Sequence, residues 1–168
     1  MTDRMESQRK KETIKLLCSV GAIFLLALLI SVFLFQIMLV QGDSMEPTLR
    51  DGQFTILNKM AGDYKRGDVA AVRCDRLKSV LVKRIAAVPG DEVVIRGSRL
   101  YINGLPDGRA VWADIKDAGI LGDALLLGSK EYIVLGDNIN HSIDSRSEEV
   151  SVIHEDDIIG RVVYPSGL

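Results

Sequence analysis

An uncharged apolar run constrains this chain more than any other feature. Residues 16–40 form 25 consecutive positions without Asp, Glu, Lys or Arg. As a helix rising 1.5 Å per residue, the run would be roughly 37 Å long, enough to cross a hydrocarbon core of about 30 Å. A buried core helix is the first alternative, but a chain of 168 residues is too small to cover such a helix on every side. A cleaved signal peptide is the second, but its apolar region is usually about 7–15 residues long, and no small-x-small cleavage site follows the run. The run therefore predicts an uncleaved membrane anchor.

The charges on either side of the run predict its orientation. Residues 1–15 carry five basic and three acidic side chains, a net of +2, which favours a cytoplasmic N-terminus by the positive-inside rule. Residues 41–168 carry the other 16 basic and 20 acidic side chains, a net of −4, and are expected outside. We therefore expect a cytoplasmic tail over 1–15, an anchor helix over 16–40 and an extracytoplasmic domain over 41–168. This is a single-pass type II arrangement in the cell membrane. The chain's net charge of −2 favours no nucleic-acid partner.

After residue 40 the pattern is one of short β-rich runs separated by turn residues. Gly97-Ser98 lies between two such runs and predicts a two-residue hairpin. Residues 105–130 lack periodicity and are expected to form a long loop with a short helical piece. The predicted fold class is mainly β, an antiparallel, barrel-like domain after one N-terminal transmembrane helix. The expected strands are 54–57, 68–73, 80–88, 92–96, 99–103, 132–135 and 158–163.

Two residues in this pattern are candidates for chemistry. Ser44 lies four residues after the apolar run, and four extended residues reach at most about 13–14 Å, so this serine is expected close to the membrane surface. A turn or cap serine is the alternative. Lys83 lies in an apolar strand beside Arg84, and the alternation of a strand puts one of the two on the same face as apolar neighbours. Lys83 is then either an edge-strand charge or a desolvated amine whose lowered pKa permits general-base chemistry.

A polar loop over residues 136–146 follows the strand at 132–135. It is dense in hydrogen-bonding groups and contains Asp137, Ser142, Asp144 and Arg146. One interpretation is a solvated surface loop. The other is a brace for the site, in which Ser142 orients the lysine and acid–base pairs hold the loop.

The order of these blocks after a single anchor resembles that of bacterial type I signal peptidases, the membrane-bound Ser–Lys proteases of peptidase family S26. The resemblance covers the anchor and most of the remaining chain. It is carried by the stretches 42–49, 66–69, 82–91, 100–104 and 136–146.

The resemblance implies a role for each candidate residue. Ser44 is the nucleophile, Lys83 is its base, and Ser142 orients the Lys83 amine. The backbone N–H of Ser44 is the implied oxyanion donor, and Gly42 stands where some family members carry a second, hydroxyl donor. The implied bracing ion pairs are Asp144 with Arg146 and Asp137 with Arg84. Residues 147–150 depart from the family, which often has an aromatic residue and a glycine there.

The resemblance also implies a substrate and partners. The substrates are signal peptides of exported preproteins, cleaved after small-x-small sites, and the partners are membrane lipid and the secretion translocon. A Ser–Lys mechanism requires no metal and no cofactor. The apolar pockets for the small substrate residues are implied to be lined by Val40, Met45, Leu49, Leu81 and Val82.

Four other functions fit parts of the sequence. A Ser–His peptidase would use His141, but in such enzymes the histidine takes the place that Lys83 holds here. A self-cleaving repressor of the Ser–Lys class would need a DNA-binding domain, for which this chain has no room. A membrane-tethered β module that binds a partner needs no catalysis at all. A sortase-type thiol would be Cys74, whose neighbours lack that family's context, and Cys74 is not expected to pair with Cys18 inside the span.

Overall fold

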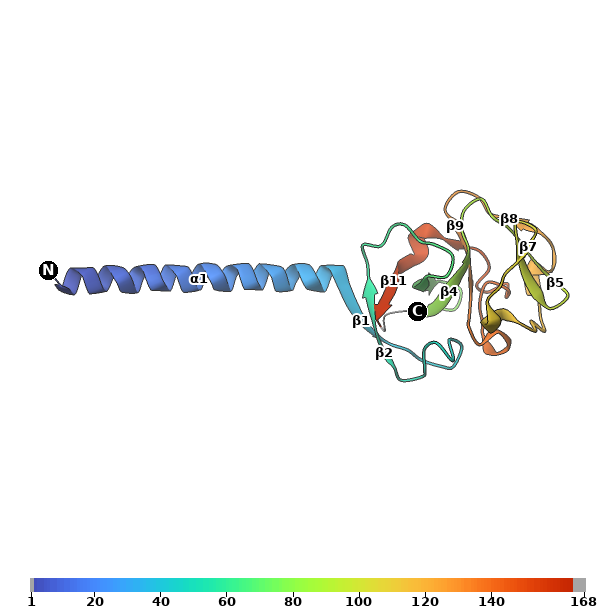
Figure 1. Ribbon diagram of the computed structural model, residues 1–168, viewed down its shortest axis with the longest axis horizontal. Coiled ribbons are helices and arrows are strands. Elements are labelled where there is room, and N and C mark those ends of the chain that lie inside the picture. The colour runs from blue at the N-terminus through green and yellow to red at the C-terminus, as the bar shows by residue number, and fades with distance from the viewer. Residues whose placement is uncertain (1, 165–168) are drawn as a thin grey trace. The chain divides into compact units, whose positions relative to one another are not determined.

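The computed structural model describes residues 2–164 (Figure 1). Met1 and residues 165–168, the ends of the predicted tail and of the predicted outer domain, lie outside the described residues. The chain divides into two compact units, Met1–Phe35 and Gln36–Leu168. In chain order the elements are α1 (Thr2–Leu34), β1 (Phe35–Leu39), β2 (Phe54–Asn58), β3 (Val69–Cys74), β4 (Ser79–Ala87), β5 (Glu92–Arg96), β6 (Arg99–Ile102), β7 (Leu105–Pro106), η1 (Ala110–Trp112), η2 (Gly119–Gly122), β8 (Leu125–Leu126), β9 (Glu131–Leu135), η3 (Ile139–His141), β10 (Ile153–His154), η4 (Glu155–Asp157) and β11 (Ile158–Tyr164).

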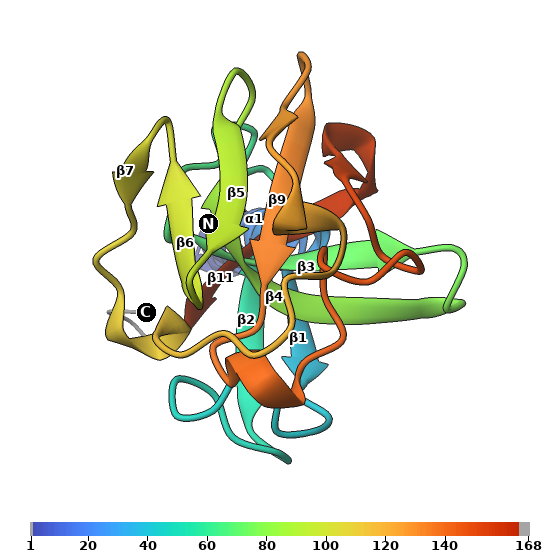
Figure 2. The same cartoon turned by 90° about the vertical axis from the view of Figure 1, so that its right-hand side faces the viewer.

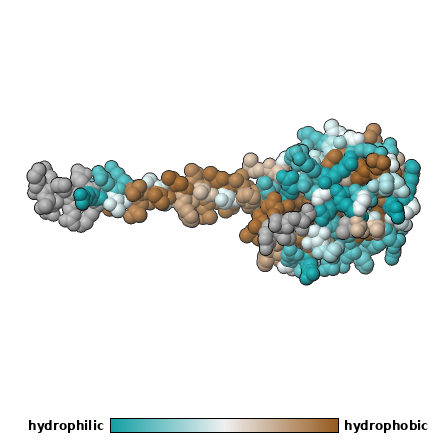
Figure 3. All heavy atoms as spheres, viewed as in Figure 1, coloured by the Kyte–Doolittle hydropathy of each residue, from teal (hydrophilic) through white to brown (hydrophobic). Residues whose placement is uncertain are grey.

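The first unit is one α-helix, α1, of 33 residues. Its segment Lys11–Leu34 is long and apolar enough to cross a membrane, and the most apolar part of that segment has none of its residues buried (Figure 3). An apolar N-terminal helix of this length is therefore confirmed.

The helix ends earlier than the sequence pattern predicts, at Leu34 instead of Val40. The reason lies in the partners available to the following residues, which form β1 beside β2. Val40 donates its N–H to the Gln53 carbonyl and accepts from the Gly52 N–H, both at 2.9 Å, and its side chain is 3% exposed. The strand β1 and the buried, hydrogen-bonded Val40 therefore take the place of the last turns of the predicted anchor helix.

The second unit contains two sheets. One has seven strands in the order β1-β2-β11-β3-β4-β9-β10, and the other has four in the order β7-β6-β5-β8. Every pairing with a described register is antiparallel. Figure 2 shows β5, β6 and β7 side by side in the smaller sheet. The mainly β, antiparallel class is confirmed, and barrel closure stays a prediction.

The turns follow the expected chemistry. Arg96 pairs with Arg99 across the β5–β6 hairpin, and Gly97 and Ser98 between them have φ of +54° and +62°, as a type I′ turn requires. Residues 105–130 contain two 3-10 helices and two two-residue strands, close to the predicted loop with a short helical piece.

The apolar core joins the sheets and fixes β4, the strand that carries the predicted base. Ile133 and Leu135 of β9 pack in one cluster with Val93 and Ile95 of the smaller sheet, and all four are buried. The strand β4 lies between β3 and β9, so its central residues have partners on both sides.

Candidate active site

The predicted nucleophile lies in a tight turn between β1 and β2. The Glu46 N–H donates to the Asp43 carbonyl at 3.0 Å, and the Leu49 N–H donates to the Met45 carbonyl at 2.9 Å. Met45 and Leu49 are 1% and 0% exposed and pack in one apolar cluster. These side chains anchor the turn in the core, whereas Ser44 beside them is only half-buried. The turn therefore presents the serine hydroxyl at the surface of the domain.

The predicted base meets that hydroxyl from the strand β4. Lys83 pairs in register with Ala70 of β3, and its side chain is buried although it carries an amine. Its Nζ lies 2.5 Å from Ser44 Oγ, within hydrogen-bonding distance. Arg84, on the other face of the strand, is buried as well. The alternation of side chains along the strand required only one of Lys83 and Arg84 to lie on an apolar face. In the structure both side chains are buried.

Burial also changes the acidity of the amine. Removal from water disfavours the ammonium form and lowers the pKa of Lys83 from 10.5 to about 8, against the opposing effect of the Asp144 and Asp137 carboxylates. With that pKa, about one tenth of the amine is uncharged at pH 7. An uncharged amine in contact with a hydroxyl can accept its proton.

An ion pair connects the base strand to the loop after β9. Arg84 Nε donates to Asp137 Oδ1 at 2.8 Å, and Arg84 Nη2 donates to Oδ2 at 2.6 Å, a bidentate contact between two buried side chains. The Thr48 hydroxyl donates to the same carboxylate and accepts from Arg84 Nη2 at 3.3 Å. The strand, the loop and the nucleophile turn are thus held by one network.

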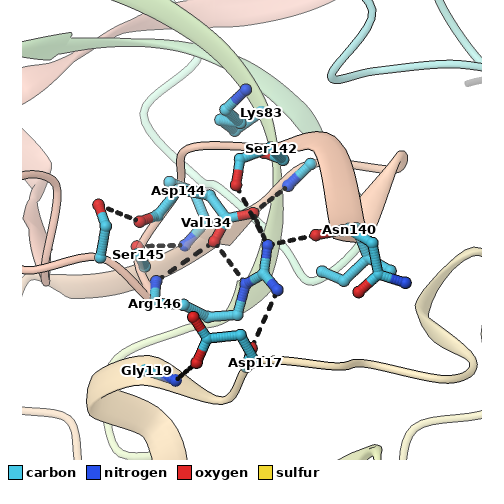
Figure 4. Close-up of polar contacts among 12 residues, drawn as sticks. Lys83, Asp117, Gly119, Val134, Asn140, Ser142, Asp144, Ser145 and Arg146 are labelled. Atoms are coloured by element: carbon cyan, nitrogen blue, oxygen red, sulfur yellow. Dashed lines mark hydrogen bonds and ion pairs between the residues drawn. The ribbon is translucent and has the colours of Figure 1, made fainter.

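A second ion pair braces the loop internally (Figure 4). Arg146 Nε donates to Asp144 Oδ1 at 2.8 Å, and Arg146 Nη1 donates to the Asp117 carbonyl at 3.1 Å. The other carboxylate oxygen of Asp144 accepts from the Gly136 N–H at 3.1 Å. The structure therefore brings together both ion pairs that the resemblance implied, and both are buried.

Ser142 is placed differently from its implied role. Figure 4 shows it in the same cluster as Lys83, but within residues 2–164 its buried Oγ has no hydrogen-bond partner. A Cβ added to Gly136 would overlap that hydroxyl and lie 2.6 Å from the Ser44 carbonyl oxygen. Gly136 thus lets Ser142 and the nucleophile turn approach each other. An orienting contact from Ser142 to Lys83 stays a prediction.

A groove leads to the serine and the lysine. It has a volume of about 360 Å³. It lies between two segments: β1 with the nucleophile turn, and the first half of β4. Its lining residues are Met38, Leu39, Val40, Gln41, Ser44, Met45, Ser79, Val80, Leu81, Val82 and Lys83.

Four of the five predicted substrate residues line this groove, and Leu49 does not. Leu49 is fully buried in the core cluster with Leu57 and Val69, so it supports the turn from beneath. Five groove residues are not predicted from the sequence. Met38, Leu39 and Gln41 lie just before the serine turn, and Ser79 and Val80 lie in the strand of Lys83; these positions were the available signals.

Two further candidates do not line the groove. His141 is exposed and is not among the groove residues. Cys74 is buried and donates a weak hydrogen bond to the Glu149 carbonyl at 3.4 Å. Over the described part of the chain, no group of three or more His, Cys, Asp or Glu side chains is arranged to hold a metal ion.

The fold and the site together define a class of protein. The antiparallel β domain holds a serine hydroxyl against a buried amine, and both groups lie at a groove lined by extended chain. This is the arrangement of a serine peptidase with a lysine base.

Comparisons with known proteins identify the family within that class. The family model described as "Signal peptidase, peptidase S26" matches residues 12–166. Signal peptidase I T of Bacillus subtilis is 39% identical over 147 residues, covering 81% of this chain and 76% of that protein. Signal peptidase I of Bacillus licheniformis is 35% identical over 159 residues, covering 88% and 85%. The chain belongs to the signal peptidase family, peptidase S26, as the resemblance implied, and is a serine endopeptidase with an apolar helix that fits a membrane anchor.

A solved structure supports the fold. Signal peptidase I from Enterococcus faecalis V583 matches with a TM-score of 0.51 and 24% identity, over 59% of this chain and 96% of that chain. At this identity the likeness supports the architecture of the β unit.

Proposed function

We propose that this protein removes signal peptides from exported preproteins, with Ser44 as nucleophile and Lys83 as its general base. The observation that carries this proposal is the 2.5 Å contact between Lys83 Nζ and Ser44 Oγ, made by a buried amine whose pKa is lowered to about 8. The membership of the chain in the signal peptidase family supports the substrate class.

The reaction proceeds by acyl transfer. The uncharged Lys83 amine accepts the proton of Ser44 as Oγ attacks the scissile carbonyl carbon, and the resulting ammonium then protonates the leaving amine. Water hydrolyses the acyl-enzyme by the reverse use of the same two groups. The N–H of Ser44 donates to no other group within residues 2–164, so it is available to the oxyanion. An oxyanion donor of this kind contributes about 2.7–4 kcal/mol.

The groove supports an extended substrate with small side chains. β4 pairs with β3 over Ser79–Arg84 but with β9 only from Arg84 onward, so the other edge of its first residues has no strand partner among the described residues. A substrate segment laid along that edge would add backbone hydrogen bonds, as in β-augmentation. The half-buried, branched side chains of Leu81 and Val82 line the groove next to Lys83, which supports a preference for small substrate residues, as in small-x-small sites.

Exposed apolar side chains on the β unit support membrane lipid as a partner. Ile37 of β1 and Phe54 of β2 are 71% and 63% exposed, and Val163 of the neighbouring β11 is 39% exposed. Figure 3 shows apolar atoms gathered at one side of this unit. Such a patch is typical of a surface that meets lipid or another protein.

The flanking charges favour a cytoplasmic tail and an outer catalytic domain, with the secretion translocon supplying substrate at the outer face. Labelling of an Arg50→Cys variant with a membrane-impermeant maleimide tests this orientation, because Arg50 is exposed beside the nucleophile turn. Labelling in intact cells after removal of the cell wall supports it. Protection until the membrane is opened contradicts it.

The full chain in detergent, incubated with a preprotein that carries an Ala-x-Ala site, tests the proposed chemistry. Ser44→Ala and Lys83→Ala are expected to abolish cleavage with their thermal unfolding intact, while the control His141→Ala retains it. Cleavage by Ser44→Ala would exclude Ser44 as the nucleophile, and absence of cleavage by the parent protein would favour a binding module. Activity of Lys83→Ala together with inactivity of His141→Ala would favour a Ser–His peptidase.

A further inference from the structure

The backbone around Ser44 is held from one side by a single residue of the polar loop. The Asn138 N–H donates to the Ser44 carbonyl at 3.0 Å, and the Asn138 side-chain Nδ2 donates to the Asp43 carbonyl at 3.2 Å. Both carbonyls that flank the nucleophile therefore accept from Asn138, which follows the ion-paired Asp137 in the chain. No other described residue contacts both carbonyls through hydrogen bonds.

The peptide group between Asp43 and Ser44 links that contact to catalysis. A trans peptide is planar, so its C=O and its N–H point in opposite directions. The carbonyl of this group belongs to Asp43, and its N–H is the Ser44 N–H proposed as the oxyanion donor. Whatever fixes the direction of the Asp43 carbonyl therefore fixes the direction of the Ser44 N–H.

The Glu46 N–H also donates to the Asp43 carbonyl, at 3.0 Å, but it belongs to the same turn and moves with it. Among the hydrogen bonds of residues 2–164, that of the Asn138 side chain alone connects this peptide to the loop that the two buried ion pairs hold in place. Gly42, with φ of +85°, has no hydroxyl that could serve as a second donor. The orientation of the Ser44 N–H thus affects how well the oxyanion is stabilised.

We propose that Asn138 is a positioning residue that aims the Ser44 N–H at the oxyanion through the Asp43–Ser44 peptide. The proposal rests on the function assigned to Ser44 and Lys83. Asn138 acts on the transition state and not on the substrate's ground state, because the oxyanion exists only after attack. It also acts independently of the base, because its side chain bonds a backbone carbonyl and not the Lys83 amine.

Asn138→Ala and Asn138→Asp test this proposal, since both remove the donor and both leave the backbone N–H that bonds to Ser44. Asn140→Ala is the matched control. Asn140 lies in the same loop and also makes two hydrogen bonds to backbone at 3.0 Å, but to Lys116 and Asp114 instead of the nucleophile turn.

With the full chain in detergent and a peptide that contains an Ala-x-Ala site, both Asn138 variants are expected to lower kcat by about tenfold to a hundredfold. Complete loss of an oxyanion donor lowers kcat by about a hundredfold to a thousandfold. The expected decrease is no larger than this, because the Ser44 N–H is still present and only the contact that orients it is lost. In Asn138→Ala, which adds no charge, KM and the midpoint of the pH profile are expected to stay as in the parent protein. Asn140→Ala is expected to keep kcat within about twofold.

A peptide aldehyde that ends in the same sequence gives a second measurement. Ser44 Oγ adds to the aldehyde carbon, and the former carbonyl oxygen takes the oxyanion position. The affinity for the aldehyde is expected to fall in the Asn138 variants by about the same factor as kcat. In chains that also carry Ser44→Ala, the Asn138 substitutions are expected to leave the affinity for the uncleaved peptide unchanged.

An unchanged kcat in a folded Asn138→Asp variant would overturn the proposal, as would a loss confined to KM or an equal loss in Asn140→Ala. If Ser44→Ala cleaves as well as the parent protein, the proposed function itself fails. If Ser44→Ala is inactive and the Asn138 variants are fully active, only the role of Asn138 fails.

Discussion

The proposed role of Lys83 as the base predicts that activity depends on pH, with a direction and a midpoint that follow from the pKa of this amine. Only the uncharged amine can accept the Ser44 proton, and burial lowers the pKa of this amine to about 8. The value of kcat/KM is therefore expected to rise about tenfold per pH unit up to pH 7 and to level off above about pH 9. At pH 6 about one hundredth of the enzyme holds the free base, and at pH 8 about half does.

The assay is hydrolysis of a fluorogenic signal-peptide substrate by the full chain in detergent, from pH 6 to pH 10. The Asp144→Asn variant is the matched perturbation, because the Asp144 carboxylate is the strongest of the charges that raise the pKa of Lys83. Its removal is expected to move the midpoint to lower pH. A profile that is flat from pH 6 to pH 9, or one with its midpoint near 6.5 as for an ordinary histidine base, would refute the assignment of Lys83.

The same amine links pH to stability. The pKa of Lys83 is lower in the folded chain than in the unfolded chain, so the unfolded state binds more protons between about pH 8 and pH 10.5. Stability contributed by this group therefore rises with pH through that window and is lower below it, by about 3 kcal/mol in all. Urea denaturation of the parent protein and of Lys83→Met at pH 7.5 and pH 10 measures the difference, which the variant is expected to lack.

Three substitutions probe how the site is supported. Asp137→Ala leaves a buried guanidinium without its carboxylate and is expected to lower the free energy of unfolding by about 3–5 kcal/mol in urea titration; a change below 1 kcal/mol would contradict the network. Gly136→Ala places a methyl group 2.6 Å from the Ser44 carbonyl oxygen, so peptide cleavage should fall at least tenfold in a chain that still unfolds cooperatively, and full activity would show that the turn has room to move. Leu49→Ala creates a cavity in the core and should cost about 2–5 kcal/mol of stability with KM unchanged; an altered KM in a stable variant would return Leu49 to the substrate groove.

Much of the fold follows from local sequence patterns. The charge-free run, the alternating β segments and the Gly97-Ser98 turn each depend on residues close together in the chain, and all three are present. The end of the helix at Leu34 was not predictable in this way, because apolar residues suit a membrane helix and a buried strand alike. Only pairing with β2 separates the two.

The site divides along the same line. The sequence stretches that resemble the family point to Ser44, Lys83 and the two acid–base pairs. The alternation of side chains along a strand predicts that one of Lys83 and Arg84 is buried, but it does not predict that both are. Leu49 was placed in the groove by resemblance and lies in the core instead. An apolar side chain in a turn can face substrate or core, and neighbours distant in sequence decide which.

What the sequence determined by itself is the kind of chain: an apolar helix, an antiparallel β unit and membership of the signal peptidase family. What the tertiary structure alone decided is that a hydroxyl and an amine 39 residues apart lie 2.5 Å from each other. That distance depends on the register of β4 between β3 and β9, on the core beneath the turn, and on a loop held by two buried ion pairs. Reactivity follows from contact and exclusion of water, and both arise only when distant segments pack together.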